Sequence, residues 1–294
     1  MGGHGGRAEG NLCGVKTKSF GATGAALPVI GQGTWQMEND DRASAVRALR
    51  RGIELGMTHL DTAELYGSGR VEEKIVAEAL VGNRDRIFLA SKVLPSNASR
   101  RGTIEACERS LRRLRTDRLD LYMLHWPGSH PLADTIAALQ QLVERKLIRF
   151  FGVSNFDVRE LEQAVSIAGS GAIACNQVLY HLQERTIERR VLPLCEKHDI
   201  AVVGYSPFGS GSFPAPQSTG GKVLARIGLA HGVTPHAVAL AFLARRPSLF
   251  TIPKASTVEH VEHNAKGDLV LGADEIAAID EAFPVGNRSG LPTL

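Results

Sequence analysis

Short apolar runs alternate with amphipathic segments along most of the chain. The apolar runs have the length of β-strands, and the segments between them carry apolar residues at helical spacing. This alternation is typical of parallel β-α units. The predicted strands span residues 29–35, 58–62, 87–93, 119–125, 150–154, 173–177, 201–206 and 250–253.

Amphipathic helices are predicted between these strands and after the last one. They span residues 42–55, 71–81, 103–115, 132–145, 158–167, 185–198, 222–243 with a break at Gly232, 258–266 and 273–282. Eight parallel units without a long linker favour a closed (β/α)8 TIM barrel over a doubly wound open sheet. Before the first unit, two extended runs flank the glycine-containing turn 21–24, so residues 15–29 predict a β-hairpin that plugs one end of the barrel.

The length of 294 residues would suit two domains, but a single barrel commonly takes about 250 residues. We therefore expect one domain over residues 15–294. Residues 1–14 are rich in glycine and offer almost nothing to bury, so they predict a disordered leader or an expression remnant.

Composition and charge narrow the functional classes. A net charge of +3 is too weak to predict nucleic-acid binding, although a small anionic ligand would suit it. No apolar run approaches the roughly 18 residues that cross a membrane, so we expect a cytoplasmic protein without a membrane partner. The four cysteines lack metal-site spacing and predict free buried thiols and no metal: Cys13, Cys107, Cys175 and Cys195.

Candidate chemistry lies where the predicted strands end, because barrel enzymes gather their functional groups there. Asp61 ends the second strand and Tyr66 follows it, Lys92 lies in the third strand, and His125 ends the fourth. A lysine in an apolar strand is costly to bury unless it is paired, so Asp61 is its expected counter-ion. Lys92 would then lower the pKa of Tyr66. Any one of these residues fits a structural ion pair or a core histidine, but all of them together favour a site.

A phenol acid beside a histidine donor is suited to protonating a carbonyl oxygen while another group attacks the carbon. The chain has no complete nucleophile elbow, so the attacking group is expected to be a hydride from a bound cofactor. The usual dinucleotide fingerprint is missing, and the Gly31 to Gln36 stretch matches only its first two glycines.

The later strand ends offer a place for such a cofactor. Ser154, Asn155 and Gln177 could hold a carboxamide, and Tyr205 could present a flat face to a nicotinamide ring. Lys254 ends the eighth strand, where barrels often bind phosphate near a helix N-terminus. That helix begins at Ser256 and Thr257, which are equally explained as a plain N-cap.

From residue 29 to the C-terminus, the chain resembles the aldo-keto reductase family. The family's catalytic aspartate, tyrosine, lysine and histidine match Asp61, Tyr66, Lys92 and His125, within Leu-Asp-Thr-Ala, Ser-Lys-Val and Leu-His-Trp-Pro stretches. The resemblance implies an NADPH-dependent enzyme that reduces aldehydes and ketones, and we expect it to be a monomer. Tyr66 would be the general acid, Lys92 and Asp61 would tune it, and His125 would orient the carbonyl.

The resemblance also implies a set of cofactor contacts along the strand ends. Gly33, Thr34 and Trp35 would flank the cofactor together with Asp61. The carboxamide, nicotinamide, pyrophosphate and adenosine phosphate would be held by Ser154, Asn155, Gln177, Tyr205, Ser206, Pro207, Phe208, Ser210, Ile252, Lys254, Ala255, Ser256, Thr257, His260, His263 and Asn264.

One departure bears on the cofactor. Many members carry Arg-x-x-Glu-Asn facing the adenosine, whereas this chain keeps Asn264 but has His260 at the arginine position. Lys254 still favours a 2′-phosphate and hence NADPH. A neutral imidazole does not replace a guanidinium, so we expect a weaker preference over NADH.

The expected substrate pocket is aromatic and suits small aldehydes or ketones. Its residues would be Trp35, Tyr66, His125, Trp126, Tyr180 and Phe208, although Tyr180 fits core packing equally well. The resemblance is strongest to bacterial members that reduce small aldehydes such as methylglyoxal. Reduction of sugar-derived dicarbonyls such as diketogluconate, a non-catalytic NADPH-binding module and a metal-dependent barrel hydrolase are the alternatives.

Overall fold

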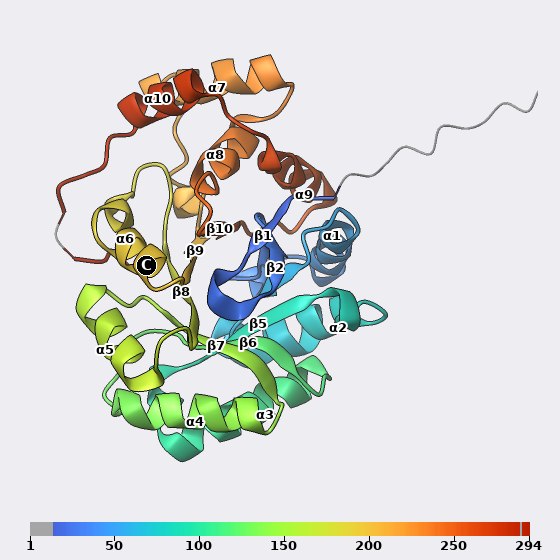
Figure 1. The fold of residues 1–294 in the computed structure, drawn as a ribbon. Coiled ribbons are helices and arrows are strands. Elements are labelled where there is room, and N and C mark those ends of the chain that lie inside the picture. The colour runs from blue at the N-terminus through green and yellow to red at the C-terminus, as the bar shows by residue number, and fades with distance from the viewer. Residues whose placement is uncertain (1–13, 289) are drawn as a thin grey trace, which may run out of the picture.

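The computed structural model describes residues 14–288 and 290–294, and its eight parallel strands form a barrel surrounded by helices (Figure 1). Each strand pairs in parallel with the next one along the chain. The bridges Ile30 to Thr251 and Gly33 to Lys254 join the two ends of this sheet. The strands are β3 (Gln32–Gly33), β4 (His59–Asp61), β5 (Phe88–Val93), β6 (Leu119–Leu124), β7 (Ile148–Ser154), β8 (Ile173–Leu179), β9 (Ala201–Tyr205) and β10 (Leu249–Ile252). The predicted (β/α)8 barrel is confirmed.

The first barrel strand, β3, covers only two residues and is shorter than the predicted range 29–35. Two glycines let the neighbouring backbones approach closely here. A Cβ atom on Gly31 would lie 2.6 Å from the carbonyl oxygen of His59, and one on Gly33 would lie 2.7 Å from that of Ile252. Side chains at these positions would force the strand away from its neighbours, so the glycines permit closure of the barrel.

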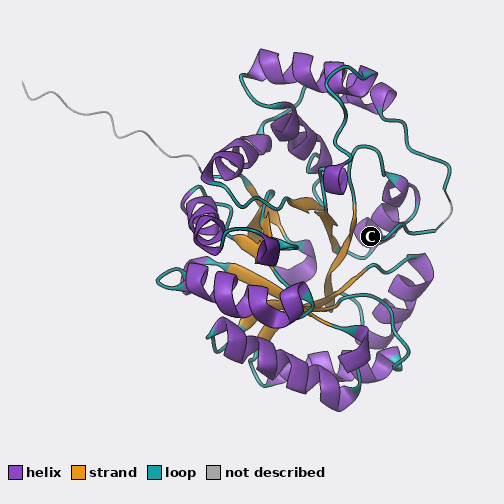
Figure 2. Cartoon of the chain, turned by 180° about the vertical axis from the view of Figure 1, so that it is seen from behind, coloured by secondary structure: helices purple, strands orange, loops and turns teal. Residues whose placement is uncertain are grey.

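Helices cover the outside of the strands, as both views show (Figures 1 and 2). Six of them begin at a Ser, Thr or Asp whose side chain accepts a hydrogen bond from a backbone N–H of the first turn. The helices are α1 (Arg42–Glu54), α2 (Ala77–Leu80), α3 (Arg100–Leu114), α4 (Leu132–Glu144), α5 (Val158–Ala168), α6 (Val191–Lys197), α7 (Thr219–His231), α8 (Pro235–Leu243), α9 (Val258–Ala265) and α10 (Ala273–Ala282).

Two predicted helices are interrupted. The range 71–81 contains a π-helical segment, Glu72–Val76, before α2, and it lies where the buried Glu72 accepts hydrogen bonds from Ser91 and Ser110. The range 185–198 divides into a 3-10 turn, Thr186–Arg189, and α6, with non-helical backbone at Arg190. The predicted break at Gly232 is confirmed, since this residue is left-handed and ends α7.

The N-terminal hairpin consists of the antiparallel strands β1 (Thr17–Ser19) and β2 (Ala26–Pro28), which Figure 1 shows over one end of the barrel. Phe20 is fully buried and packs its ring against His59, Phe88 and Phe250. The hairpin therefore seals this end of the barrel as predicted, and the opposite end, where the strands terminate, is left for a pocket.

Three predicted free cysteines, Cys107, Cys175 and Cys195, are free and buried, and Cys13 lies outside the described residues. Residues 1–13 of the predicted leader also lie outside them, and the single domain over residues 15–294 stays a prediction. Within the described part of the chain, no single helix is long and apolar enough to cross a membrane. The helices α7 and α8 would reach that length only together, and they are bent by 96° at their break.

Candidate active site

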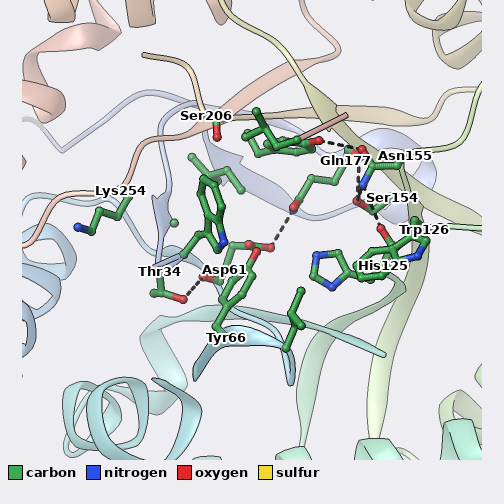
Figure 3. Close-up of a pocket in the computed structure, with 16 residues that line it drawn as sticks. Thr34, Asp61, Tyr66, His125, Trp126, Ser154, Asn155, Gln177, Ser206 and Lys254 are labelled. Atoms are coloured by element: carbon green, nitrogen blue, oxygen red, sulfur yellow. Dashed lines mark hydrogen bonds between the residues drawn. The ribbon is translucent and has the colours of Figure 1, made fainter. Parts of the chain in front are cut away.

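A pocket of about 260 Å³ lies where the parallel strands end, opposite the hairpin (Figure 3). Residues from seven of the eight barrel strands or the loops that follow them line it, together with one residue from the C-terminal segment. The lining residues are Gly33, Thr34, Trp35, Asp61, Leu65, Tyr66, His125, Trp126, Ser154, Asn155, Gln177, Tyr205, Ser206, Ile252, Lys254 and Leu294.

A buried ion pair supports the wall of this pocket. Asp61 is the last residue of β4, and Lys92 lies on the neighbouring strand β5. The Lys92 ammonium donates to Asp61 Oδ1 at 2.6 Å, to the carbonyl oxygen of Thr62 at 3.0 Å and to the hydroxyl of Tyr66 at 3.2 Å. These three bonds give each ammonium hydrogen a partner inside the protein. They are needed because Lys92 is fully buried and Asp61 is 1% exposed, so water cannot replace them. The predicted pairing of Asp61 with Lys92 is therefore present, and it reaches Tyr66.

Burial and charge together set the protonation of this group. Burial alone would lower the pKa of Lys92, but Asp61 and Tyr66 raise it above its ordinary value, so the ammonium stays charged. Burial raises the pKa of Tyr66, and Lys92 only partly opposes this rise. Lys92 lowers the pKa of Tyr66, as predicted, but the loss of hydration outweighs this effect, so the pKa lies above its ordinary value. At neutral pH, Tyr66 thus keeps its proton.

His125 follows β6 directly and lies beside Tyr66 in the pocket. The two rings meet nearly edge to face with their centroids 5.9 Å apart, and the Trp126 ring lies 4.7 Å from the imidazole. Burial and the nearby Lys92 lower the pKa of His125 to about 2, so the imidazole is neutral. Its buried Nδ1 has no hydrogen-bond partner in the described structure. The neutral imidazole and the protonated phenol each have one hydrogen-bond donor, so together they could bind one oxygen atom of a ligand.

A row of amide side chains adjoins these groups. Gln177 on β8 donates from Nε2 to Asp61 Oδ2 at 2.8 Å, which leaves the amide oxygen of Gln177 as an acceptor. Asn155 donates to the carbonyl oxygen of His125 at 3.1 Å and accepts from the Tyr205 hydroxyl at 2.9 Å. Because these bonds run from the amides to Asp61 and His125, the amide row and the ion pair form one connected network.

The far end of the pocket is reached at Lys254, which points away from Tyr66 in Figure 3. Its ammonium forms an ion pair with Asp40 at 2.6 Å. The next helix, α9, begins close by, and its N-cap Thr257 accepts a hydrogen bond from the backbone N–H of His260. This end therefore combines one lysine with the N-terminal turn of a helix.

Comparison with known proteins identifies the family. The model of the aldo/keto reductase family matches residues 29–283, which is most of the chain. The chain belongs to the aldo/keto reductase family.

Relatives of this aldo/keto reductase cover almost its whole length. It is 44% identical to the methylglyoxal reductase YeaE of Escherichia coli, with 88% of this chain and 92% of YeaE aligned. It is 31% identical to the glyoxal reductase of Bacillus subtilis, covering 87% of this chain and 89% of that protein. It is also similar to the crystal structure of an aldo/keto reductase from Klebsiella pneumoniae in complex with NADP and acetate. That match has a TM-score of 0.88 and 41% identity, and it covers 95% of this chain and 100% of the other.

Two predicted pocket residues of this aldo/keto reductase lie elsewhere. Tyr180 is fully buried, and its hydroxyl bonds to Glu188 and Arg245, so its assignment to the pocket is wrong and the core-packing alternative holds. Phe208 also lies outside the lining, with its ring against Phe213 and His236. Both residues follow strand ends, but neither is among the residues that line the pocket.

The remaining predicted cofactor residues divide into two groups. Gly33, Thr34, Trp35 and Ile252 line the pocket with Ser154 and Ser206. A second set lies beyond it, on the loops after β9 and β10 and on α9, and its place in a cofactor site stays a prediction: Pro207, Phe208, Ser210, Ala255, Ser256, Thr257, His260, His263 and Asn264.

Two lining residues of this aldo/keto reductase were missed. Leu65 immediately precedes Tyr66 and is 41% exposed at the pocket. Reading the neighbours of the candidate acid would have found it. Leu294 also lines the pocket. The family resemblance implies that the C-terminal tail, residues 284–294, shapes the substrate pocket, but it does not single out this residue.

Proposed function

We propose that this aldo/keto reductase reduces aldehyde and ketone carbonyls to alcohols with NADPH, and that Tyr66 is the general acid. One observation carries the proposal. A single buried ammonium, that of Lys92, contacts both Asp61 and the hydroxyl of Tyr66, and Tyr66 faces the pocket. An ion pair with only a structural role would not need a pocket-lining phenol as its third partner.

The residues of the pocket fit a nicotinamide cofactor. Gln177 and Asn155 present amide groups beside the proposed acid, as binding of a carboxamide requires. Tyr205 lines the same pocket with an aromatic ring on which a nicotinamide can stack, and Lys254 offers a positive charge at the other end. When bound, NADPH supplies the hydride that the carbonyl carbon accepts.

The chain's own part in the reaction is to bind the carbonyl oxygen and to protonate it. The Tyr66 hydroxyl and the neutral His125 imidazole donate hydrogen bonds to that oxygen, where negative charge develops. Tyr66 then transfers its proton to the oxygen, which completes the alcohol and leaves a phenolate. The ammonium of Lys92, held by Asp61, stabilises this phenolate until solvent restores the proton.

Small neutral aldehydes such as methylglyoxal are the substrates that the pocket favours over an anionic sugar acid such as diketogluconate. Trp35, Leu65 and Trp126 are each more than a third exposed around its mouth. The positive charge of Lys92 is fully buried and already paired, and Lys254 lies at the opposite end. A substrate carboxylate would therefore lose its hydration at an apolar rim without gaining a free cation. The identity to a methylglyoxal reductase supports the same choice.

We further propose that the enzyme is a cytoplasmic monomer that needs no nucleic-acid or membrane partner. The described residues of one chain supply the lining of the pocket, which supports a site complete in the monomer. The three free buried cysteines suit a reducing compartment. A metal-dependent hydrolase is disfavoured, because the described residues include no group of three His, Cys, Asp or Glu side chains placed to bind a metal.

The test is the rate of NADPH and NADH oxidation with methylglyoxal, benzaldehyde and diketogluconate, measured in parallel. We expect turnover of the two neutral aldehydes, faster with NADPH, and little turnover of the sugar acid. Faster reduction of diketogluconate would contradict the proposed substrate class. Tight NADPH binding without turnover of any carbonyl would instead support a regulatory module.

A further inference from the structure

The Lys254 ammonium at the far end of the pocket is already bound to a carboxylate of this chain. Lys254 follows β10, and Asp40 lies just before α1, so their contact at 2.6 Å spans the two loops that border this end. The side chains are 34% and 26% exposed, respectively, and the ion pair is therefore partly shielded from water.

No second permanent cation among the lining residues shares the task of Lys254. It is the one lysine or arginine among the described residues that line the pocket. On the adjacent first turn of α9 the nearest basic side chain in sequence is His260, whose imidazole lacks the forked, permanently charged donors of a guanidinium. A ligand anion at this end consequently depends on an ammonium that Asp40 has already neutralised.

We propose that Asp40 determines the nucleotide specificity of this enzyme, because it holds Lys254 and so weakens the preference for the 2′-phosphate of NADPH over the unphosphorylated ribose of NADH. The inference rests on the proposed function, in which Lys254 meets the phosphate of the cofactor. Asp40 is a specificity residue that acts through Lys254 and has no part in the chemical step.

Two physical routes each weaken the binding of NADPH relative to that of NADH. If the ion pair opens when the nucleotide binds, the free energy of the Asp40 to Lys254 contact is lost from the binding of NADPH. If the pair stays closed, the carboxylate remains next to the incoming phosphate and repels it. NADH lacks the 2′-phosphate, so neither route changes its affinity to the same extent.

The experiment compares Asp40→Asn with Asp41→Asn. Both variants lose one negative charge at adjacent positions. Asp41 is the N-cap of α1 and accepts from the backbone N–H of Ser44, a role that asparagine also fills, so the control keeps the helix. Trp35 and Trp126 are the two tryptophans of the chain and both line the pocket, so quenching of their fluorescence reports nucleotide binding without turnover.

Asp40→Asn should tighten NADPH binding about threefold to fivefold, the range expected for a partly exposed ion pair, and leave the Kd of NADH nearly unchanged. Calorimetry with 2′,5′-ADP and 5′-AMP should show the same selective gain, which assigns it to the 2′-phosphate. In Asp41→Asn the ratio of the two affinities should stay as in the wild type.

Three results would overturn this inference. Equal tightening in both variants would mean a general charge effect. Weaker binding of both nucleotides in Asp40→Asn would mean that the ion pair acts as a strap over the bound cofactor. An unchanged ratio in Asp40→Asn would mean that Asp40 does not act on Lys254. Failure of the wild type to bind either nucleotide would instead refute the proposed function itself.

Discussion

Two tyrosines of this barrel each contact an ion pair that is largely shielded from water, yet only one of them faces the pocket. Tyr66 accepts a hydrogen bond from Lys92, the partner of Asp61. Tyr180 accepts one from Arg245, the partner of Glu188. Both settings combine a phenol, a cation and a carboxylate, and they differ in where the phenolic proton goes.

The Tyr180 hydroxyl donates its proton to Glu188 Oε1 at 2.5 Å, so this hydroxyl is satisfied as donor and as acceptor. Tyr66 has no acceptor for its own proton among the described residues, and its side chain lines the pocket. The comparison shows that an ion pair beside a phenol does not make an acid. The proton must also be free to move to a ligand.

The largest effect is expected from Tyr66→Phe, which removes the free proton but keeps the ring. Carbonyl reduction should fall by about 10²- to 10⁴-fold, the usual contribution of a positioned acid. Nucleotide binding should persist, because the amide row and Lys254 are untouched. Turnover of methylglyoxal and quenching of tryptophan fluorescence measure the two quantities. Near-normal turnover would rule out the role of Tyr66 as the acid.

Removal of the Lys92 ammonium should lower both the stability and the activity of the enzyme. Lys92→Met leaves the carboxylate of Asp61 buried without its counter-ion, and we expect the free energy of unfolding to fall by about 3–5 kcal/mol. Urea denaturation measures this change. Lys222→Met, at an exposed position of α7, is the matched control and should change stability by less than about 0.5 kcal/mol. Equal stability of both variants would mean that the buried pair is not required by the fold.

Tyr180→Phe should have the opposite profile to Tyr66→Phe. It leaves Glu188 and Arg245 short of one hydrogen bond, so stability should fall by about 1–3 kcal/mol while kcat stays close to that of the wild type. Tyr122→Phe is a suitable control, because the buried Tyr122 hydroxyl has no partner in the described structure and its loss should not destabilise the protein. A large loss of kcat in Tyr180→Phe would place Tyr180 in the site after all.

The smallest effect concerns His125, the second proposed hydrogen-bond donor to the carbonyl oxygen. Burial and Lys92 lower the pKa of His125 to about 2, so in the folded protein this imidazole takes up its proton only in strong acid. With saturating nucleotide and substrate, kcat of the wild type should therefore show no inflection from His125 between about pH 5 and 8, where an exposed histidine would titrate. Loss of activity in His125→Gln without such an inflection in the wild type would fit a neutral donor. An inflection near pH 6.5 that His125→Gln abolishes would contradict it.

The sequence was sufficient for the architecture and for the centre of the site. All eight strands were predicted because a barrel strand buried on both faces is a continuous apolar run. Lys92 was noticed because it is a charged residue within such a run. Asp61, Lys92 and His125 were found because strand ends converge in a barrel, and Tyr66 because it follows one of them in a short loop.

The sequence did not reveal contacts between residues that are distant in the chain, nor pKa shifts that depend on burial. Tyr180 follows a strand end as the pocket residues do, and only its bond to Arg245, 65 residues away, shows that it turns inward. The net pKa shift of Tyr66 depends on how much water is excluded, which no spacing of residues reveals. Asp40 lies in a loop without a pattern, so its contact with Lys254 could be found only in three dimensions.

Closure of the barrel by its first and last strands has a consequence for biosynthesis. The bridges from Ile30 to Thr251 and from Gly33 to Lys254 join segments separated by most of the chain. A ribosome that has made all but the last barrel strand therefore holds an open sheet with two unpaired edges, which are prone to pair with other chains. Lys254 is made in the same final stretch, so the end of the pocket that Lys254 borders cannot be completed until the sheet is able to close.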